Sequence, residues 1–330
     1  MWILLASLTL LSVLSLLAYR FMIDVKPRMS RTASGQSHQS EIEALQTRLM
    51  VHVQVLGETI GERHLGRPQA LQAAADYVRQ TWSHQGLTVS EERFEVGGQP
   101  VVNLIVEQTG SARPEEILVV GAHYDTAPGT PGANDNGTGV ALLLEMARAL
   151  KNETFQRTIR YVAFVNEEPP HCFTERMGSR VHARGARARG ENIVAMISLE
   201  TLGYYSSSAG TQGYPFPLGL FYPRTGNFVG VVGNLRSRAL VIKFLEHFMA
   251  ASDSPVEGIA TFDWIPGISW SDHWSFWQEG YPALMLTDTA PFRYPEYHGS
   301  QDVPGRITAL EYARAALGVV QAVRGLATAP

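Results

Sequence analysis

The sequence predicts an α/β fold in which helices cover both faces of a mainly parallel sheet. Short runs rich in β-branched and aromatic residues alternate with segments whose apolar residues recur at helical spacing. Three of the predicted strands end just before acidic or histidine residues, as expected where the carboxyl ends of strands meet at one edge of such a sheet. The region after the N-terminal segment has ordinary globular composition and, at about 290 residues, is long enough for one large domain.

The predicted elements follow one another in the order that this fold requires. Helical periodicity covers 41–56 and 70–85, and the second helix ends at Gly86, a residue typical of helix C-termini. A Gly-, Ser- and Tyr-rich stretch at 203–219 is typical of a loop. The remaining helices are predicted at 139–150, 174–188, 234–250 and 308–323, and the strands at 88–94, 101–107, 117–122, 159–165, 193–199 and 283–286.

The N-terminal segment predicts a membrane anchor. From Met1 to Tyr19 the chain carries no charged side chain, which approaches the roughly 20 apolar residues that cross a bilayer. Because it lacks a basic start and a small-residue cleavage site, an uncleaved anchor at 1–23 is favoured over a cleaved signal peptide. Residues 24–40 predict a flexible tether and 41–330 a single folded domain. Basic residues after the anchor favour a cytoplasmic domain by the positive-inside rule.

Charge and cysteine content exclude several classes of function. The net charge of −4 is unlike that of a nucleic-acid-binding protein, which carries a basic patch. Cys172 is the single cysteine, which excludes an intrachain disulfide and a cysteine-based zinc site. The arginines of the run 176–189 are expected on a solvated helix face, and histidines without ligand-like spacing, such as His52 and His182, on the surface.

Acidic and histidine residues follow the predicted strands in a pattern that suits a two-metal hydrolytic site. His123 can donate a ring nitrogen to a metal, while Asp125, two residues further on, can accept its other ring N–H. Asp135 lies in a Gly- and Asn-rich turn before a helix and is suited to bridge two metals. Glu167 and Glu168 are adjacent and point apart, so that one can bind metal while the other acts as a general base.

These motifs and two later ones resemble the co-catalytic zinc aminopeptidase family, which also contains glutaminyl cyclases and glutamate carboxypeptidases. The resemblance covers about residues 41–325 and implies a three-layer α/β sandwich with a mainly parallel mixed sheet, of the phosphorylase/hydrolase-like type. It rests on His-Tyr-Asp at 123–125, Gly-Ala-Asn-Asp-Asn-Gly-Thr-Gly at 132–139, Asn-Glu-Glu at 166–168, Ser-Asp-His-Trp-Ser-Phe-Trp at 271–277 and Tyr-His-Gly-Ser-Gln-Asp at 297–302.

The resemblance implies a role for each residue of the site. Glu167 would be the general base, Asp125 the residue that orients His123, and Asp272 a buried partner near Glu167. The peptide bond between Asp135 and Asn136 is expected to be cis. One zinc would be bound by His123, Asp135 and Glu200, and the other by Asp135, Glu168 and His298.

Two departures from the family pattern bear on this assignment. Glu200 stands where aminopeptidases of the family commonly have Asp, so two zinc ions are expected, but one if Glu200 does not bind metal. Some relatives carry an oxyanion-stabilising Tyr before the Ser-Asp-His motif, where this chain has Ile268-Ser269-Trp270. Tyr204, Tyr205 and His273 are therefore alternative candidates for that donor.

The expected activity is hydrolysis of N-terminal peptide bonds in peptides or aminoacyl amides with a free N-terminus. The alternative within the same family is a glutaminyl cyclase-like zinc acyltransferase, which would form a ring from an N-terminal Gln. A non-catalytic binding module is disfavoured because every expected ligand position holds a competent side chain. Because similar proteins are usually exported, the domain is expected on the extracytoplasmic side of the membrane, against the charge rule.

Overall fold

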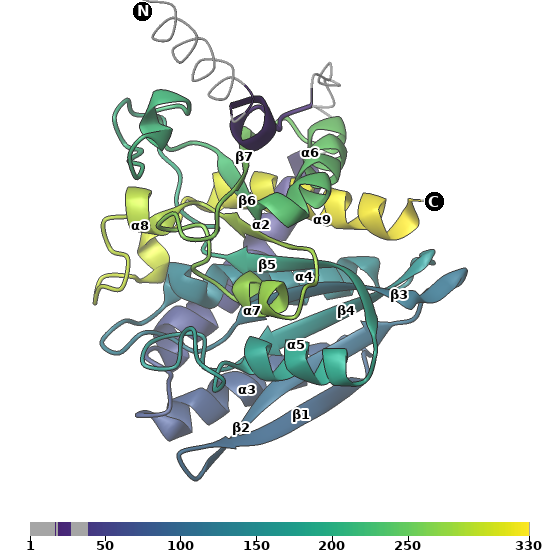
Figure 1. Ribbon diagram of the computed structural model, residues 1–330. Helices are drawn as coiled ribbons and strands as arrows, with labels where there is room; N and C mark the ends of the chain where they lie inside the picture. Colours follow the sequence, from purple (N-terminus) through teal and green to yellow (C-terminus); the bar gives the residue numbers. More distant parts are fainter. Residues whose placement is uncertain (1–16, 18, 28–38, 330) are drawn as a thin grey trace, which may run out of the picture.

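The computed structural model describes residues 17, 19–27 and 39–329, and within them one mixed sheet of eight strands lies between two layers of helices (Figure 1). The spatial order of the strands is β1-β2-β4-β3-β5-β8-β6-β7. Neighbouring strands β4, β3, β5 and β8 are parallel, whereas β1, β2 and the pair β6–β7 join through antiparallel contacts. The strands are β1 (Val89–Val96), β2 (Gln99–Gln108), β3 (Arg113–His123), β4 (Arg157–Phe164), β5 (Asn192–Glu200), β6 (Val229–Asn234), β7 (Val256–Thr261) and β8 (Ala283–Thr287).

Helices cover both faces of the sheet, which confirms the predicted α/β sandwich. Alternate residues of a strand point to opposite faces, so that Leu118 and Val120 of β3 pack in one core and Ile117 and Val119 in the other. The first core also contains α2 (Gln39–Gln54), α3 (Pro68–His84), α4 (Gly139–Leu150), α6 (Arg238–Ala251) and α9 (Ala309–Thr328); the second contains α5 (Gly178–Ala188) and α7 (His273–Gln278), and α8 (Ala290–Arg293) follows β8.

Most predicted elements occur within a few residues of their expected limits, and α4 coincides with the predicted helix at 139–150. The helix expected at 174–188 is shorter and starts at Gly178, because the backbone at Met177 is extended and the Gly178 N–H bonds to the carbonyl of Val165. The helix expected at 234–250 starts at Arg238, after a turn in which the Asn234 side chain caps the N–H of Ser237. Strands β6 and β7 were not predicted from the sequence.

Two histidines expected on the surface are buried instead. His52 faces the carboxylate of Glu145 at 3.4 Å, and the Nδ1 atom of His182 lies 3.1 Å from Glu92. Each ring pairs with a carboxylate that comes from a distant part of the chain. The expectation was wrong because such partners are brought together only by the tertiary fold.

The residues before α2 pack against the outer strand β7. Val25 is buried and joins the first core, and the Lys26 ammonium lies 2.8 Å from a carboxylate oxygen of Glu257 in β7. The start of the expected tether therefore lies on the domain. Most of the expected anchor, 1–16 and residue 18, falls outside the described residues, and among those described no helix has both the length and the apolar character needed to span a membrane.

Candidate metal centre

The carboxyl ends of β3, β4 and β5 meet at one edge of the sheet and bring the predicted site residues together. His123 is the last residue of β3 and Glu200 the last residue of β5. The pair Glu167–Glu168 follows β4 after a short turn. Because β3 lies between β4 and β5 in parallel register, these side chains share one crevice, as the order of motifs predicted.

Asp135 reaches the crevice through a bend in the backbone before α4. Its φ and ψ of −105° and 95° are not helical, and its peptide bond to Asn136 is cis, as the resemblance implied. Gly132 begins the bend with a φ of 68°, and a side chain there would collide with Thr126 and the carbonyl oxygen of Asp135. The Asn136 side chain accepts hydrogen bonds from the N–H groups of Gly139 and Thr201, which fastens the bend to the end of β5.

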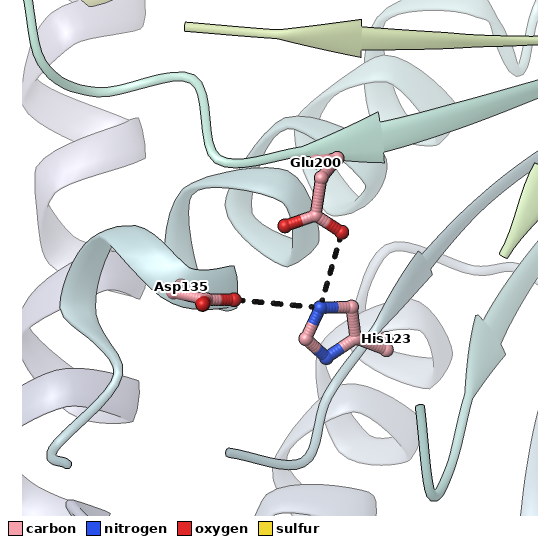
Figure 2. Close-up of side chains that lie close together, drawn as sticks. All are labelled: His123, Asp135 and Glu200. Carbon is pink, nitrogen blue, oxygen red and sulfur yellow. Dashed lines mark ion pairs between the residues drawn. The ribbon is translucent and has the colours of Figure 1, made fainter. Parts of the chain in front are cut away.

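A first group of potential ligands consists of His123, Asp135 and Glu200 (Figure 2). The Nε2 atom of His123 lies 3.5 Å from Oδ1 of Asp135 and 3.3 Å from Oε2 of Glu200. Glu200 Oε2 also accepts a hydrogen bond of 2.7 Å from the Ser271 hydroxyl. The longer glutamate side chain therefore reaches the position that the resemblance assigned to a ligand.

A second group consists of Asp135, Glu168 and His298. The Nε2 atom of His298 lies 3.2 Å from Oδ2 of Asp135 and 3.3 Å from Oε2 of Glu168. Asp135 thus presents Oδ1 to the first group and Oδ2 to the second. One carboxylate shared between two groups is the arrangement that a pair of metal ions requires.

The chemistry of these groups fits bound cations. Three buried atoms, His123 Nε2, Asp135 Oδ1 and Glu168 Oε1, have no hydrogen-bond partner among the described residues, although buried polar atoms are normally partnered. Burial and then the nearby Asp135 carboxylate raise the pKa of Glu168 to about 7, since a second negative charge is disfavoured there. A divalent cation would offset this repulsion and supply the missing partners.

The histidines of the two groups respond to the same surplus of negative charge. Burial alone lowers the pKa of His298, but the facing carboxylates of Asp135 and Glu168 outweigh it and raise the pKa to about 10. In the same way, burial disfavours protonation of His123, and chiefly Glu200 raises its pKa well above the usual range. The surrounding carboxylates therefore favour the protonated, positively charged form of both imidazole rings.

Asp125 makes contacts beyond the one expected with His123. Its carboxylate accepts hydrogen bonds of 3.1 Å from the backbone N–H groups of both Glu167 and Glu168. Its Oδ1 atom lies 3.6 Å from Nδ1 of His123, which lies closer, at 3.3 Å, to the backbone oxygen of Asp125. Burial raises the pKa of Asp125, but His123 and the two N–H groups outweigh it, and the pKa is lowered overall.

Glu167 lies beside both groups. Its Oε2 atom is 3.9 Å from His123 Nε2, and its side chain retains 12% exposure, more than that of Asp135 or Glu168. Burial, and to a smaller extent Glu168, Glu200 and Asp272, raise the pKa of Glu167 well above its usual value. Asp272 is fully buried and its pKa is raised to about 7, mainly by burial.

Three residues that support the site were not predicted as such. Asp302 accepts hydrogen bonds from the N–H groups of Asn134 and Asp135, at 2.8 and 3.0 Å. Arg63 is fully buried and donates to the backbone oxygens of Tyr124 and Gly132, at 2.6 and 2.9 Å. Both lie in segments that carry the family resemblance, but neither has a spacing that indicates its partner.

The third is Tyr297, whose ring stacks on the imidazole of His298 with centroids 4.0 Å apart. Burial and the nearby acids, Asp135 first among them, raise the pKa of its hydroxyl. The oxyanion candidates named from the sequence lie elsewhere. Tyr205 has a buried hydroxyl, and the ring of Tyr204 packs at a tilted angle against that of Tyr294. His273 bonds to the Ile268 carbonyl, and burial lowers its pKa to about 4.

Two cavities flank the centre. The first is bordered by Glu200 and Tyr297 and is largely apolar, with Leu218, Phe228, Ile259, Ile268, Trp270 and Met285 in its wall. The second is bordered by Asp125 and Glu168. We call the first the apolar cavity and the second, whose lining is the more polar of the two, the polar cavity.

Comparisons with known proteins agree with this geometry. A sequence model described as Peptidase family M28 matches residues 103–323. The uncharacterized protein YfbL of Escherichia coli is 34% identical over 277 residues, which are 81% of this chain and 84% of that protein.

Among solved structures, the zinc aminopeptidase BSAP of Bacillus subtilis is similar with a TM-score of 0.67, at 16% identity over 86% of this chain and 95% of that one. A glutaminyl cyclase of Fimbriiglobus ruber is similar with a TM-score of 0.60, at 19% identity over 84% of this chain and 94% of that one. At such identities the likeness concerns the fold, which both kinds of enzyme share.

Proposed function

This chain belongs to peptidase family M28 and is a zinc metallopeptidase, and on that premise we propose that it is an aminopeptidase. Its substrates would be peptides or aminoacyl amides with a free N-terminus. The observation that carries the proposal is the pair of ligand groups joined by Asp135, with Glu167 beside them and an apolar cavity at Glu200.

We assign one zinc to His123, Asp135 and Glu200 and the other to Asp135, Glu168 and His298. Bound zinc would supply Lewis-acid polarisation of the scissile carbonyl and of the attacking water. Ser271 would hold the carboxylate of Glu200 through its hydroxyl, and Asp125 would fix the backbone from which Glu167 and Glu168 project.

Glu167 is the proposed general base. Its carboxylate lies close enough to the centre to take a proton from water, and its N–H is held by Asp125. The same carboxylate would return the proton to the leaving amine, as general acid–base catalysis requires. The hydroxyl of Tyr297, beside His298 and at the rim of the apolar cavity, is the group best placed to donate to the developing oxyanion.

The apolar cavity is the proposed binding site for the side chain of the N-terminal residue. Its wall combines Leu218, Phe228 and Met285 with aromatic rings, and a Leu or Phe side chain would lose its hydration there. We expect activity to rise with the apolar area of this residue. A substrate α-amino group would meet the surplus of carboxylates at the centre, which accounts for the requirement for a free N-terminus.

The test uses the full chain in detergent, loaded with zinc, and a panel of aminoacyl anilides with an N-acetylated twin of each. Amine release from the free-amine compounds alone, fastest for Leu and Phe, is the expected result. Equal release from the acetylated twins would contradict the assignment as an aminopeptidase.

The alternative is a glutaminyl cyclase-like acyltransferase. The replacement of the usual Asp by Glu200 favours it. Mass spectrometry of a peptide with N-terminal Gln separates the two activities, because cyclisation lowers the mass by one ammonia and hydrolysis removes the whole residue.

We further propose that residues 1–23 anchor the protein in a membrane, with the folded domain on the extracytoplasmic side. The apolar run from Met1 to Tyr19 supports an anchor, and Tyr19 is exposed and of a residue type enriched at membrane interfaces. Protease added to intact cells should degrade an extracytoplasmic domain, whereas protection until lysis would place the domain in the cytoplasm.

A further inference from the structure

The polar cavity, which Asp125 and Glu168 border, is also lined by a positively charged side chain, Arg176, to which the proposed reaction gives no role. We propose that this cavity binds the C-terminal carboxylate of a short peptide, a dipeptide or tripeptide, through the guanidinium group of Arg176. The inference rests on the proposed aminopeptidase function and specifies its class of substrate.

Arg176 differs from the other arginines of its run. In the parts of the chain that the structure describes, its guanidinium forms neither a hydrogen bond nor an ion pair, and its one hydrogen bond is made by its backbone N–H. The others have partners: Arg180 contacts Glu175 and Glu279, Arg184 contacts Glu175, Arg189 contacts Glu191, and Arg187 lies over the ring of Tyr281.

Arg176 is exposed, but it does not lie on a helix face. It precedes α5, in the segment that follows Glu168, and its side chain lines the polar cavity. The sequence placed it on a helix face, but the helix begins only at Gly178. Arg176 is therefore an unpaired cation in the wall of a cavity that borders the metal ligands.

The cavity is walled by four separate parts of the chain. They are the loop at 64–66, the turn at 96–99 between β1 and β2, Asp125, and the segment from Asn166 to Arg176. Nearby side chains do not neutralise Arg176. The adjacent carboxylate of Glu175 pairs instead with Arg180 and Arg184.

The lining of this cavity combines groups of opposite charge. Asp125 and Glu168 belong to the metal centre, and Arg176 comes from the segment before α5. His171 lines the same cavity. Its Nδ1 atom is buried and has no partner among the described residues, so it is available to a ligand.

This polarity matches a short peptide bound with its scissile bond at the centre. If the N-terminal side chain enters the apolar cavity beside Glu200, the leaving portion extends to the opposite side, toward Asp125 and Glu168. Arg is permanently charged, and its planar group binds a carboxylate through two parallel hydrogen bonds. A C-terminal carboxylate one or two residues beyond the scissile bond would meet it.

The experiment compares Leu-Gly, which has a free carboxylate, with Leu-Gly-amide, which has none, on the full zinc-loaded chain. Removing a charge-assisted hydrogen bond typically costs a factor of about ten to one hundred. Arg176→Gln should therefore lower kcat/KM for Leu-Gly by about tenfold or more, mainly through KM, and leave Leu-Gly-amide unchanged. Arg176→Lys should recover part of the loss.

Arg184→Gln is the matched control, because Arg184 is exposed, pairs with Glu175 and does not line the cavity. This variant should leave kcat/KM unchanged for both substrates. Equal losses on both substrates in Arg176→Gln, or no loss on either, would overturn the proposal. In a series of peptides of increasing length, the loss of kcat/KM caused by Arg176→Gln should become smaller beyond the tripeptide. A loss that does not depend on peptide length would also contradict the proposal.

A binding measurement separates this inference from the proposed function. Calorimetric titration of Leu-Gly into zinc-loaded Glu167→Gln should show binding that weakens when Arg176→Gln is added. If the wild type hydrolyses neither peptide, the aminopeptidase assignment fails. Binding that depends on Arg176 and on the carboxylate would still support the cavity assignment, and binding independent of them would refute it.

Discussion

The carboxylate of Asp302 accepts a hydrogen bond of 3.0 Å from the backbone N–H of Asp135, the residue that both ligand groups share. A second bond, from the N–H of Asn134, and a third, from the hydroxyl of Tyr294, fix the orientation of Asp302. The position of the shared ligand therefore depends on a residue that holds its backbone and belongs to neither group.

Replacing Asp302 should weaken metal binding more than it weakens the fold. Loss of a group that orients a ligand typically lowers metal affinity by about 10- to 100-fold. We expect Asp302→Ala to do so in zinc competition with a fluorescent chelator, and Asp302→Asn to have a smaller effect because it retains an acceptor. Asp263→Asn serves as the control, because Asp263 is an exposed residue. Unchanged zinc affinity in Asp302→Ala would show that the bend holds without it.

Glu167→Gln should abolish turnover while zinc remains bound. Loss of a general base typically costs about 10²- to 10⁴-fold in rate, and Glu167 belongs to neither of the two groups that share Asp135. The checks are steady-state hydrolysis of leucine anilide and zinc content by elemental analysis. A variant with full activity would remove Glu167 from the mechanism, and one without zinc would identify it as a ligand.

Glu200→Ala should reduce the zinc content from two ions per chain to one. Glu200 and His123 form the first group with Asp135, whereas the second group does not include either of them. Elemental analysis after equilibrium dialysis gives the stoichiometry. Should the wild type also bind a single zinc ion, Glu200 would not act as a ligand, and the one-zinc cyclase alternative would gain support.

Far from the centre, Glu145 predicts a dependence of stability on pH. Its carboxylate lies 2.6 Å from Arg48, 2.8 Å from Arg148 and 3.4 Å from His52. Burial raises its pKa, but these partners outweigh burial and lower the pKa to about 2. Since the pKa is lower in the folded state, the stabilisation is complete above the unfolded value near 4.5 and is lost as the pH falls toward 2.

Urea unfolding of wild type and Glu145→Gln, both stripped of zinc, measures this contribution. The difference in unfolding free energy should be roughly 1–2 kcal/mol at pH 6, after allowance for the partial exposure of the arginines, and should shrink toward pH 3. A difference that does not change between these pH values would contradict the assignment. Stripping the zinc removes the pH dependence of metal binding from the comparison.

The sequence predicted which acidic and histidine side chains lie together better than it predicted the sheet. His123, Glu168 and Glu200 follow strands whose apolar runs are easily recognised, so their common edge could be inferred from the alternation of elements. Strands β6 and β7 were missed because they contain glycines and are short, and their pairing depends on distant residues such as Met285. Tertiary pairing of this kind leaves little local signal.

The supporting residues were harder to infer for a similar reason. Asp302 acts through backbone N–H groups more than 160 residues away, and no periodicity or spacing indicates such a contact. Tyr297 is not among the oxyanion candidates named from the sequence, which are Tyr204, Tyr205 and His273. Its place immediately before His298 was a signal that could have identified it.

The contact of Val25 and Lys26 with β7 has a practical consequence for preparing a soluble enzyme. Strand β7 is the last of the sheet, and Val25 lies beside Gly258 on it. Cutting the chain just before α2 would remove Val25 and open to solvent the apolar surface on which it packs, which can then associate with another molecule. A version that starts before Tyr19 should stay monodisperse in conditions where the shorter one self-associates.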